Sequence, residues 1–400
     1  MTSPTQSAWI GAPIGCPVLP SDSSQDEHHE VEPLPLNTRV LHVINGEHYS
    51  GAERVQDLLA MQLPRLGAEV GFACLKRDAF PNARQSDAPI FETPMQGRLD
   101  FSAAKRLADV IDEGGYEIVH AHTPRTVMIA RSACRRTKAR LVYHVHSPTC
   151  RDTTSWLRNS CLAWAERLSL RGGVPLICVS HSLADHMTLL GYAEDQITVV
   201  PNGVPRCNPP VIQQRPTDEW VLGTVALFRG RKGTEVLIDA LATLRKAGLP
   251  VRMRAVGPFE TPEYETSLKQ RVTRHGLEDA VDWVGFTRDV NAELKKMDLF
   301  VLPSLFGEGL PMVVLEAMAA ALPVVGTRVE GVPEAVRDGQ EGVLAKPSDA
   351  EDLAAAIRRI MDGDLDWRQL SENAVFRHGE RFSDEAMAAG VAEVYRRVLS

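Results

Sequence analysis

The 400-residue sequence predicts an α/β protein with two Rossmann-like, doubly wound domains that face each other across a cleft. Three observations support this class. The chain is too long for one ordinary domain. Short apolar segments alternate with segments of helical period through both halves, as they do in βαβ units. Residues 205–216 contain four prolines and little periodicity, so we expect them to link the two halves.

The first half is predicted to begin with a tail over residues 1–37, which carries five acidic residues and no Lys or Arg. Its composition favours disorder. The N-terminal domain is expected to span residues 38–207. We expect its strands at 39–44, 70–74, 118–120, 141–145 and 176–179. We expect its helices from residue 51 and over 101–113, 124–137, 153–170 and 181–190.

The second half, residues 208–381, repeats the alternation. We expect strands at 221–226, 251–256, 281–284, 299–302, 323–325 and 342–344. We expect helices over 233–247, 262–275, 291–297, 311–321, 332–337 and 349–361. A last amphipathic helix should start after residue 382, with Ser383 as its N-cap. Ligands of such folds bind between the carboxyl ends of the strands.

Residues 303–331 carry the strongest functional signal. Pro311 suits the first position of a helix whose other residues are almost all apolar, except Glu316. A buried carboxylate without a partner is costly, so Glu316 must meet a cation or a polar ligand. Glu308 lies on the loop before the helix, whose N-terminal N–H groups can bind a phosphate. These groups suit a ligand that has a diphosphate and several hydroxyls, such as a nucleotide-sugar.

The spacing Glu308-x7-Glu316, flanked by EGLPMVVLEAMAAALPVV and GVPEAVRDGQEGVL, resembles the signature of the family 4 retaining glycosyltransferases. The resemblance covers about residues 39–400. It implies the GT-B fold, with a C-terminal helix over about 382–400 that crosses back to the N-terminal domain. It also implies transfer of a sugar, with retention, from a UDP- or GDP-sugar to an acceptor hydroxyl, in cell-surface polysaccharide or glycolipid synthesis.

The resemblance also implies that the N-terminal domain, residues 38–207, binds the acceptor and that the C-terminal domain, residues 208–381, binds the donor. Glu316 would accept hydrogen bonds from the ribose hydroxyls, and Glu308 would contact hydroxyls of the transferred sugar. The backbone N–H groups of Gly309 and Leu310 would bind the diphosphate. Phe286, on a loop after a strand, would lie along the nucleobase.

Cations and a glycine complete the expected site. Lys232 stands between a strand and a helix, where its charge can reach a diphosphate. The family places an arginine five residues before this lysine, but Leu227 stands there. We therefore assign the phosphate-binding role to Arg229, with Arg231 as the alternative. Gly51, in a loop similar to the family's G-G-x-E, lets the backbone approach the donor.

His146, in VYHVHSP, matches the family's V-x-H segment. The resemblance implies that it orients a sugar hydroxyl and helps to bind the transition state, so it joins Glu308 and Lys232 as a catalytic candidate. No Asp-x-Asp falls on a loop expected at the cleft. We therefore predict that the protein uses no metal or other cofactor, and that the nucleoside diphosphate sugar is a co-substrate. A sugar-nucleotide epimerase and a non-catalytic nucleotide-sugar-binding protein remain alternatives.

Composition bounds the partners and the location. The net charge of −8 argues against binding to nucleic acid. Seven scattered cysteines, the lack of a basic and apolar leader and the lack of a long apolar run favour the cytoplasm. The acceptor is expected to be a saccharide or a lipid-linked molecule. Peripheral contact with the inner face of the membrane is possible through a basic cluster, Arg131, Arg135, Arg136, Lys138 and Arg140, and an apolar stripe, Trp156, Leu157, Cys161, Trp164 and Leu168.

Overall fold

The structure is a computed structural model that describes residues 34–35, 37–47, 49–76, 78–97, 100, 102–148, 166–207 and 212–400. Pro33–Ser400 form one compact unit, and Met1–Glu32 are outside it. The predicted tail therefore lies almost wholly outside the described residues. Its end is ordered earlier than expected, because Leu34 is buried and its N–H donates to Leu66 O at 2.9 Å.

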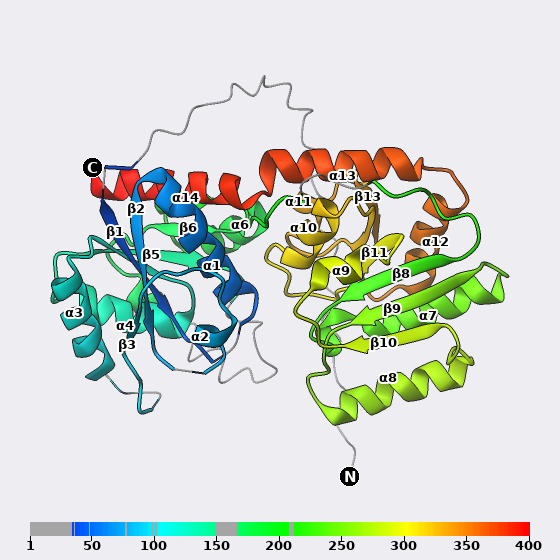
Figure 1. Ribbon diagram of the computed structural model, residues 1–400, viewed down its shortest axis with the longest axis horizontal. Coiled ribbons are helices and arrows are strands. Elements are labelled where there is room, and N and C mark those ends of the chain that lie inside the picture. The colour runs from blue at the N-terminus through cyan, green and yellow to red at the C-terminus, as the bar shows by residue number, and fades with distance from the viewer. Residues whose placement is uncertain are drawn as a thin grey trace, which may run out of the picture. The chain divides into compact units, whose positions relative to one another are not determined.

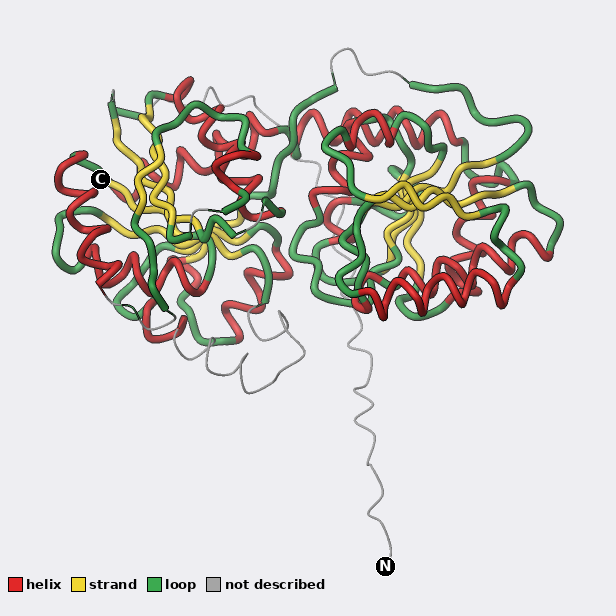
Figure 2. Tube along the Cα trace, turned by 60° about the horizontal axis from the view of Figure 1, so that its bottom comes forward, coloured by secondary structure: helices red, strands yellow, loops and turns green. Residues whose placement is uncertain are grey.

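The first domain contains a parallel seven-stranded sheet in the order β3-β2-β1-β4-β5-β6-β7 (Figure 1). The strands are β1 (Thr38–Ile44), β2 (Ala68–Cys74), β3 (Ile90–Glu92), β4 (Ile118–Ala121), β5 (Arg140–Val145), β6 (Leu176–Cys178) and β7 (Ile197–Val199). The helices between them are α1 (Gly51–Gln62), η1 (Leu63–Leu66), α2 (Phe80–Ala83), α3 (Ser102–Gly114), α4 (Pro124–Cys134), α6 (His181–Leu189) and η3 (Glu194–Gln196). The apolar strands are buried because helices cover both faces of the sheet, as Figure 2 shows.

The second domain contains a parallel six-stranded sheet in the order β10-β9-β8-β11-β12-β13. The strands are β8 (Trp220–Val225), β9 (Val251–Val256), β10 (Val281–Gly285), β11 (Leu299–Leu302), β12 (Val324–Thr327) and β13 (Gly342–Ala345). The helices are η4 (Gly230–Lys232), α7 (Thr234–Lys246), α8 (Pro262–His275), α9 (Val290–Leu294), α10 (Met312–Ala319), α11 (Val332–Ala335), α12 (Ala350–Met361), α13 (Trp367–Arg381) and α14 (Asp384–Leu399). In each sheet the strand order switches at the first strand, because β1 lies between β2 and β4 and β8 lies between β9 and β11. Folds of this kind bind ligands at such a switch point.

The predicted fold class is confirmed, with local differences. Strands β3 and β7 and helices α2 and α13 were not predicted. Strand β3 is only three residues long and half-buried at the sheet edge, so it has no clear apolar period. The buried side of α13 includes Ser371 and His378, and these polar residues hide its helical pattern. The predicted helix over 153–170 lies mostly outside the described residues.

The last helix crosses back to the first domain, as predicted. Ser383 Oγ accepts from the N–H of Ala386 at 3.2 Å and caps α14. Gln62 Nε2 in α1 then donates to Asp384 Oδ2 at 2.7 Å. In Figure 1, α13 runs along the second domain and α14 along the first. The exact domain limits at residues 37/38 and 207/208 remain predictions.

Candidate active site

Glu308 lies buried in the loop between β11 and α10, where polar side chains meet its carboxylate. Lys232 Nζ is 2.5 Å from Glu308 Oε1, and Ser304 Oγ donates to the same oxygen at 2.7 Å. Arg231 Nη1 lies 3.4 Å from it. Burial acts to raise the pKa of Glu308, but the charges of Lys232 and Arg231 outweigh burial and lower it. The carboxylate is therefore held ionised.

Lys232 is brought to Glu308 by a close approach of two backbone segments. Gly233, which follows Lys232, has a φ of 65°, and a Cβ there would lie 2.0 Å from Pro303 O. Only glycine allows the loop to pack against residue 303 in this conformation. Burial lowers the pKa of Lys232, although the neighbouring Glu308 opposes the shift. The two loops follow β8 and β11, which are adjacent in the sheet.

The two candidate arginines lie in different surroundings. Arg229 Nη1 is 3.5 Å from Glu260 Oε1. Arg231 Nη1 donates to Gly307 O at 3.0 Å, next to Glu308. The structure thus brings Arg231 to the lysine–glutamate pair and pairs Arg229 elsewhere. The assignment of phosphate binding to one of them remains a prediction.

Glu316 lies in α10 and is only 3% exposed. Arg54, from α1 of the first domain, forms an ion pair with it. Burial raises the pKa of Glu316, and the charge of Arg54 only partly offsets this effect. Pro311 is the N-cap of α10, so the helix starts one residue later than expected.

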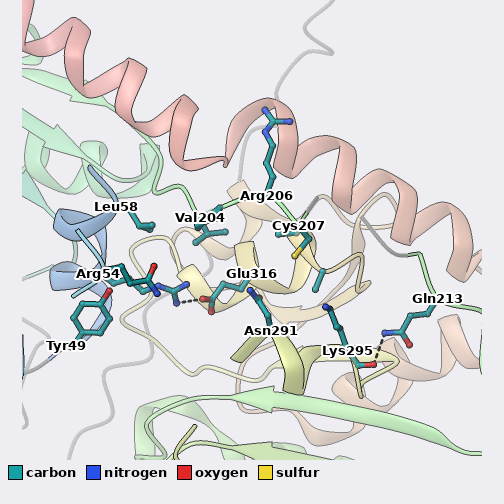
Figure 3. A pocket seen from close by; sticks show the side chains of 14 residues that line it. Tyr49, Arg54, Leu58, Val204, Arg206, Cys207, Gln213, Asn291, Lys295 and Glu316 are labelled. Carbon is teal, nitrogen blue, oxygen red and sulfur yellow. Dashed lines mark hydrogen bonds and ion pairs between the residues drawn. The ribbon is translucent and has the colours of Figure 1, made fainter. Parts of the chain in front are cut away.

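A cavity of about 600 Å³ lies beside this ion pair. Figure 3 shows the Arg54–Glu316 ion pair at this cavity, with Asn291 next to Glu316 and with Lys295 and Cys207 farther from Arg54. Its walls come from both domains. Glu316 lines the cavity, whereas Lys232, Glu308 and His146 do not.

Gly309 and Leu310 lie where the two domains touch. A Cβ on Gly309 would be 2.0 Å from the carbonyl oxygen of His146, so the contact requires glycine. Asn202 Nδ2 donates to Leu310 O at 2.9 Å, which is a second contact between the domains. Within the described ranges, no backbone carbonyl accepts from the N–H groups of Gly309 or Leu310.

His146 belongs to a cluster of five histidines at the ends of three neighbouring strands. Its Nε2 lies 3.0 Å from His122 Nδ1, and burial lowers the pKa of His146 to about 3. The other members are His42, His120 and His144. Among the described residues, the triads His42–His120–His122 and His122–His144–His146 have nitrogens close enough together to hold a metal ion. The absence of a required metal stays a prediction.

The remaining two predicted residues occupy less constrained positions. Gly51 is the first residue of α1, and a Cβ there would meet Met312 Sδ only at 3.9 Å. Phe286 is 72% exposed and follows Gly285, which has a φ of 78°. An exposed aromatic ring can stack on a base, but its role remains a prediction.

Comparison with known families covers both halves of the chain. Residues 49–206 match the model described as Glycosyltransferase Family 4, and residues 210–375 match the model described as Glycosyl transferases group 1. The chain belongs to these glycosyltransferase families. The predicted resemblance is thereby confirmed.

Relatives in this family come from bacterial glycan synthesis. The phosphatidyl-myo-inositol mannosyltransferase of Mycobacterium leprae is 27% identical over 319 residues, which cover 76% of this chain and 80% of that protein. The lipopolysaccharide core biosynthesis mannosyltransferase LpsB of Rhizobium meliloti is 32% identical over 184 residues, or 44% of this chain and 52% of LpsB. The chain spans about half the length, or less, of several curated relatives that it matches.

Solved structures share the fold of this family. Anabaena HepE in complex with UDP has a TM-score of 0.78 at 22% identity, covering 90% of this chain and all of HepE. A glycosyltransferase from Rickettsia africae has a TM-score of 0.78 at 21% identity, covering 91% of this chain and 99% of that chain. The two domains of the present protein therefore have the GT-B arrangement.

Sequence reasoning missed two acidic side chains that hold this glycosyltransferase site in place. Glu334 accepts from the N–H groups of His181 and Ser182, at 2.7 and 2.8 Å, and so caps α6 across the domains. Glu330 accepts from the N–H of Glu308 at 3.2 Å. Glu334 lies in the stretch 331–344 that carries the family resemblance, and Glu330 lies directly before that stretch. Nothing local in the sequence indicated either role, because Glu334 caps a helix of the other domain and Glu330 contacts the loop that carries Glu308.

The basic cluster lies around a different cavity, of about 760 Å³. Four of its members line this cavity together with Asp112 and Glu117: Arg135, Arg136, Lys138 and Arg140. Arg131 instead donates to Arg171 O at 2.7 Å. The apolar stripe falls outside the described residues except for Leu168, which is exposed. Among the helices of the described ranges, none has the length and apolar character needed to cross a membrane.

Proposed function

We propose that the protein is a retaining glycosyltransferase that moves a sugar from a nucleoside diphosphate sugar to an acceptor hydroxyl. The observation that carries the proposal is the buried Lys232–Glu308 pair near the N–H groups of Gly309 and Leu310, which donate to no backbone carbonyl of the described residues. A cation, two backbone donors and a helix N-terminus together attract a diphosphate. UDP and UDP-glucose bound to the HepE structures support this donor class.

The mechanism follows from where charge develops. As the glycosidic bond lengthens, the leaving diphosphate gains negative charge, and Lys232 with the Gly309 and Leu310 N–H groups stabilises it. Glu308 binds hydroxyls of the transferred sugar, and its negative charge favours an oxocarbenium-like transition state. His146 orients a sugar hydroxyl from the first domain. Each well-placed donor contributes about 3–4 kcal/mol to such a barrier.

Glu316 is assigned to the ribose hydroxyls, and this role requires a change of partner. Arg54 now pairs with the carboxylate. A ribose that binds there must share Glu316 with Arg54 or displace it. Phe286 and Gly51 complete the donor site, with the phosphate-binding arginine taken as Arg229 or Arg231. No metal takes part in the proposed reaction, because cations and the α10 N-terminus supply the positive charge.

The test is transfer by the purified full chain. It is incubated with UDP-, GDP- and ADP-sugars, and nucleotide release is followed with and without saccharide and lipid-linked acceptors. We expect release that depends on acceptor, and a product with the donor's anomeric configuration by NMR. Conversion of donor without acceptor would establish the epimerase alternative. Donor binding without nucleotide release or conversion would establish the other alternative, a non-catalytic nucleotide-sugar-binding protein.

Two variants test the site itself. Lys232→Ala and Glu308→Gln should each reduce kcat by about 10²–10³-fold while the protein stays folded by circular dichroism. The matched controls are Lys269→Ala and Glu265→Gln, which alter an exposed lysine–glutamate pair in α8 and should leave kcat unchanged. Full activity in both site variants would refute the assignment.

The proposal also covers the class of acceptor and contact of the protein with a membrane surface. Relatives named for polysaccharide, lipopolysaccharide and phosphatidyl-inositol reactions support a cell-surface glycan or glycolipid acceptor. The basic cluster supports contact with an anionic bilayer. Sedimentation with phosphatidylglycerol vesicles tests this contact, with phosphatidylcholine vesicles as the control. Replacing Arg135, Arg136 and Lys138 by Gln should abolish binding, and unchanged binding would exclude this surface.

A further inference from the structure

Three histidines of the first domain form a hydrogen-bonded chain that ends at His146. His42 Nδ1 is 3.0 Å from His122 Nε2, and His122 Nδ1 is 3.0 Å from His146 Nε2. They come from β1, the end of β4 and the end of β5, which are neighbours in the sheet. His42 and His122 are buried, whereas His146 is partly exposed. The chain therefore runs from the sheet interior to the residue that touches Gly309.

The hydrogen bonds of the chain must all point in the same direction. Burial lowers the pKa of His42 to about 3 and that of His122 well below its usual value, so both rings are neutral. A neutral imidazole has one N–H and one bare nitrogen. Because His122 uses both nitrogens, it accepts at one and donates at the other. The proton positions of the three rings are thus fixed together.

The surroundings of the two chain ends select one direction. His42 Nε2 is buried and has no hydrogen-bond partner among the described residues. If the bonds ran inward, this nitrogen would carry an unpaired N–H, and buried unpaired N–H groups are rarer than buried unpaired acceptors. If they run outward, His42 donates to His122 and His122 donates to His146. His146 Nε2 is then the acceptor, and Nδ1 carries the proton.

His146 Nδ1 is the end of the chain that a ligand can reach. It makes no hydrogen bond within the described part of the protein, yet it is not among the enclosed atoms that lack a partner. It is therefore accessible on a residue that borders the donor loop at Gly309. An N–H there donates to an oxygen and cannot act as a base.

We propose that His42 and His122 are positioning residues that hold His146 with its N–H at Nδ1, so that His146 donates a hydrogen bond to an oxygen of the bound donor. This inference rests on the proposed function, because it specifies how His146 contacts the sugar. It assigns no role to His144, the nearest neighbour by ring stacking. Both nitrogens of His144 lack a hydrogen-bond partner within the described ranges.

A metal ion is the competing use of these rings. The same histidines form the two triads whose nitrogens lie close together. A bound metal needs nitrogen lone pairs that converge on one point. His122 belongs to both triads, and each of its nitrogens already lies 3.0 Å from a nitrogen of another histidine, so ligation by His122 would break a hydrogen bond of the chain.

The tautomer can be measured without turnover. Long-range ¹H–¹⁵N NMR on protein labelled with ¹⁵N-histidine reports which nitrogen of each ring carries the proton. We expect His146 to be protonated at Nδ1 alone. His122→Leu removes the donor to His146 and should shift the proton partly to Nε2, and His42→Leu should act in the same direction. His122→Gln keeps one acceptor and one donor and should restore the Nδ1 form.

His144→Phe is the matched control, because it removes a buried histidine that stacks on His146 but makes no hydrogen bond to it. We expect this variant to keep the wild-type tautomer. An unchanged His146 tautomer in a folded His122→Leu variant would overturn the proposal. So would an equal shift in His144→Phe, or metal content that a chelator removes together with a change in the His122 and His146 signals.

Activity then separates this inference from the proposed function. With the donor and acceptor found by the transfer assay, His122→Leu should lower kcat by about 10–100-fold with little change in the KM of the donor, and His122→Gln should recover most of the loss. A protein that transfers no sugar but shows the predicted tautomers would refute the function and keep the histidine chain. An active protein in which the His146 tautomer does not respond to His122→Leu would keep the proposed function and refute the histidine chain.

Discussion

The two domains line the candidate site with opposite electrostatic character. The first domain offers five histidines that burial keeps neutral, since their pKa values are lowered where they are buried together. The second domain offers Lys232, Arg231 and Glu308, which are similarly enclosed but meet opposite charges. Burial thus lowers the pKa of the histidines on one side, whereas on the other side the neighbouring cations outweigh burial and lower the pKa of Glu308. For Glu308 the charged partners, more than the depth, decide the ionisation state.

The difference assigns separate tasks to the two domains. Positive charge that can attract a diphosphate belongs to the second domain. The first domain can direct hydrogen bonds at neutral oxygens without attracting or repelling the anion. One ion pair connects the two domains, because Arg54 of the first domain pairs with the carboxylate of Glu316 in the second.

The largest effect should come from removing the carboxylate that keeps the second domain's side ionised. Lys232 is 13% exposed and Glu308 6%, so Glu308→Ala would leave a buried cation without its partner. We expect a loss of about 3–5 kcal/mol in the free energy of unfolding, measured by urea denaturation. The control is Glu265→Ala in the exposed α8 pair, with a change of about 0.5 kcal/mol or less. Equal effects in the two variants would mean that burial of the pair does not matter.

A second substitution acts on the contact between the two sides. Gly309→Ala would push a Cβ against the His146 carbonyl, which is backbone and cannot move aside like a flexible side chain. We expect a loss of about 1–3 kcal/mol in unfolding free energy and weaker donor binding in a titration. Gly230→Ala, where a Cβ meets nothing within 4 Å, is the control for glycine replacement in the donor loops. If Gly309→Ala is as stable as Gly230→Ala, the domains do not touch there in solution.

The third test addresses the pair that crosses the domains. Arg54→Ala leaves Glu316 buried without a cation, and we expect a loss of about 1–2 kcal/mol at neutral pH, less than for a fully buried pair because Arg54 is 32% exposed. Burial already raises the pKa of Glu316 in the folded state, and losing Arg54 raises it further. Folding then takes up a proton, so the loss grows as the pH rises through the raised pKa.

At a pH below the ordinary carboxyl range, Glu316 is protonated in the folded and unfolded states, and the loss should shrink. Urea denaturation at about pH 3, below the ordinary carboxyl range, and at about pH 7 measures the difference between the two conditions. Arg39→Ala, which breaks an exposed pair with Glu69, supplies a variant whose effect should be small at both values. A pH-independent effect of Arg54→Ala would show that Glu316 does not depend on Arg54 for its charge.

The meeting of Lys232 and Glu308 was predictable because each follows a parallel strand, and parallel strands end at the same edge of a sheet. The need for a cation near Glu316 was also predictable from one acid in an apolar helix. Its identity as Arg54 was not, because that partner is set by how two separately folded sheets pack. The same reason hid Glu334, which caps a helix of the other domain.

The histidine cluster was only partly visible in the sequence. Each of three strands carries histidines near its end, but sequence alone does not say that β1, β4 and β5 are adjacent. Their order is 2-1-4-5 in the sheet, and only that order brings His42, His122 and His146 into line. Helix α13 was not predicted for a different reason. On its buried face Ser371 donates to Ala321 O, and His378 Nε2 forms a hydrogen bond with Val204 O. Tertiary partners there replace the apolar residues that a pattern search needs.

The smallest expected effect concerns the helix that joins the two sides from outside the site. Ser383 Oγ caps α14, which spans the first domain after α13 has followed the second. Ser383→Ala should cost about 1 kcal/mol of unfolding free energy, and Ser383→Asp should retain stability because aspartate also caps helices. Donor affinity and the His146 tautomer should not change, since both depend on the strand ends and their loops. A change in donor affinity or in the His146 tautomer would show that α14 couples the histidines of the first domain to the charged residues of the second. Any such coupling would pass through the first domain, which α14 contacts at Gln62 and His120.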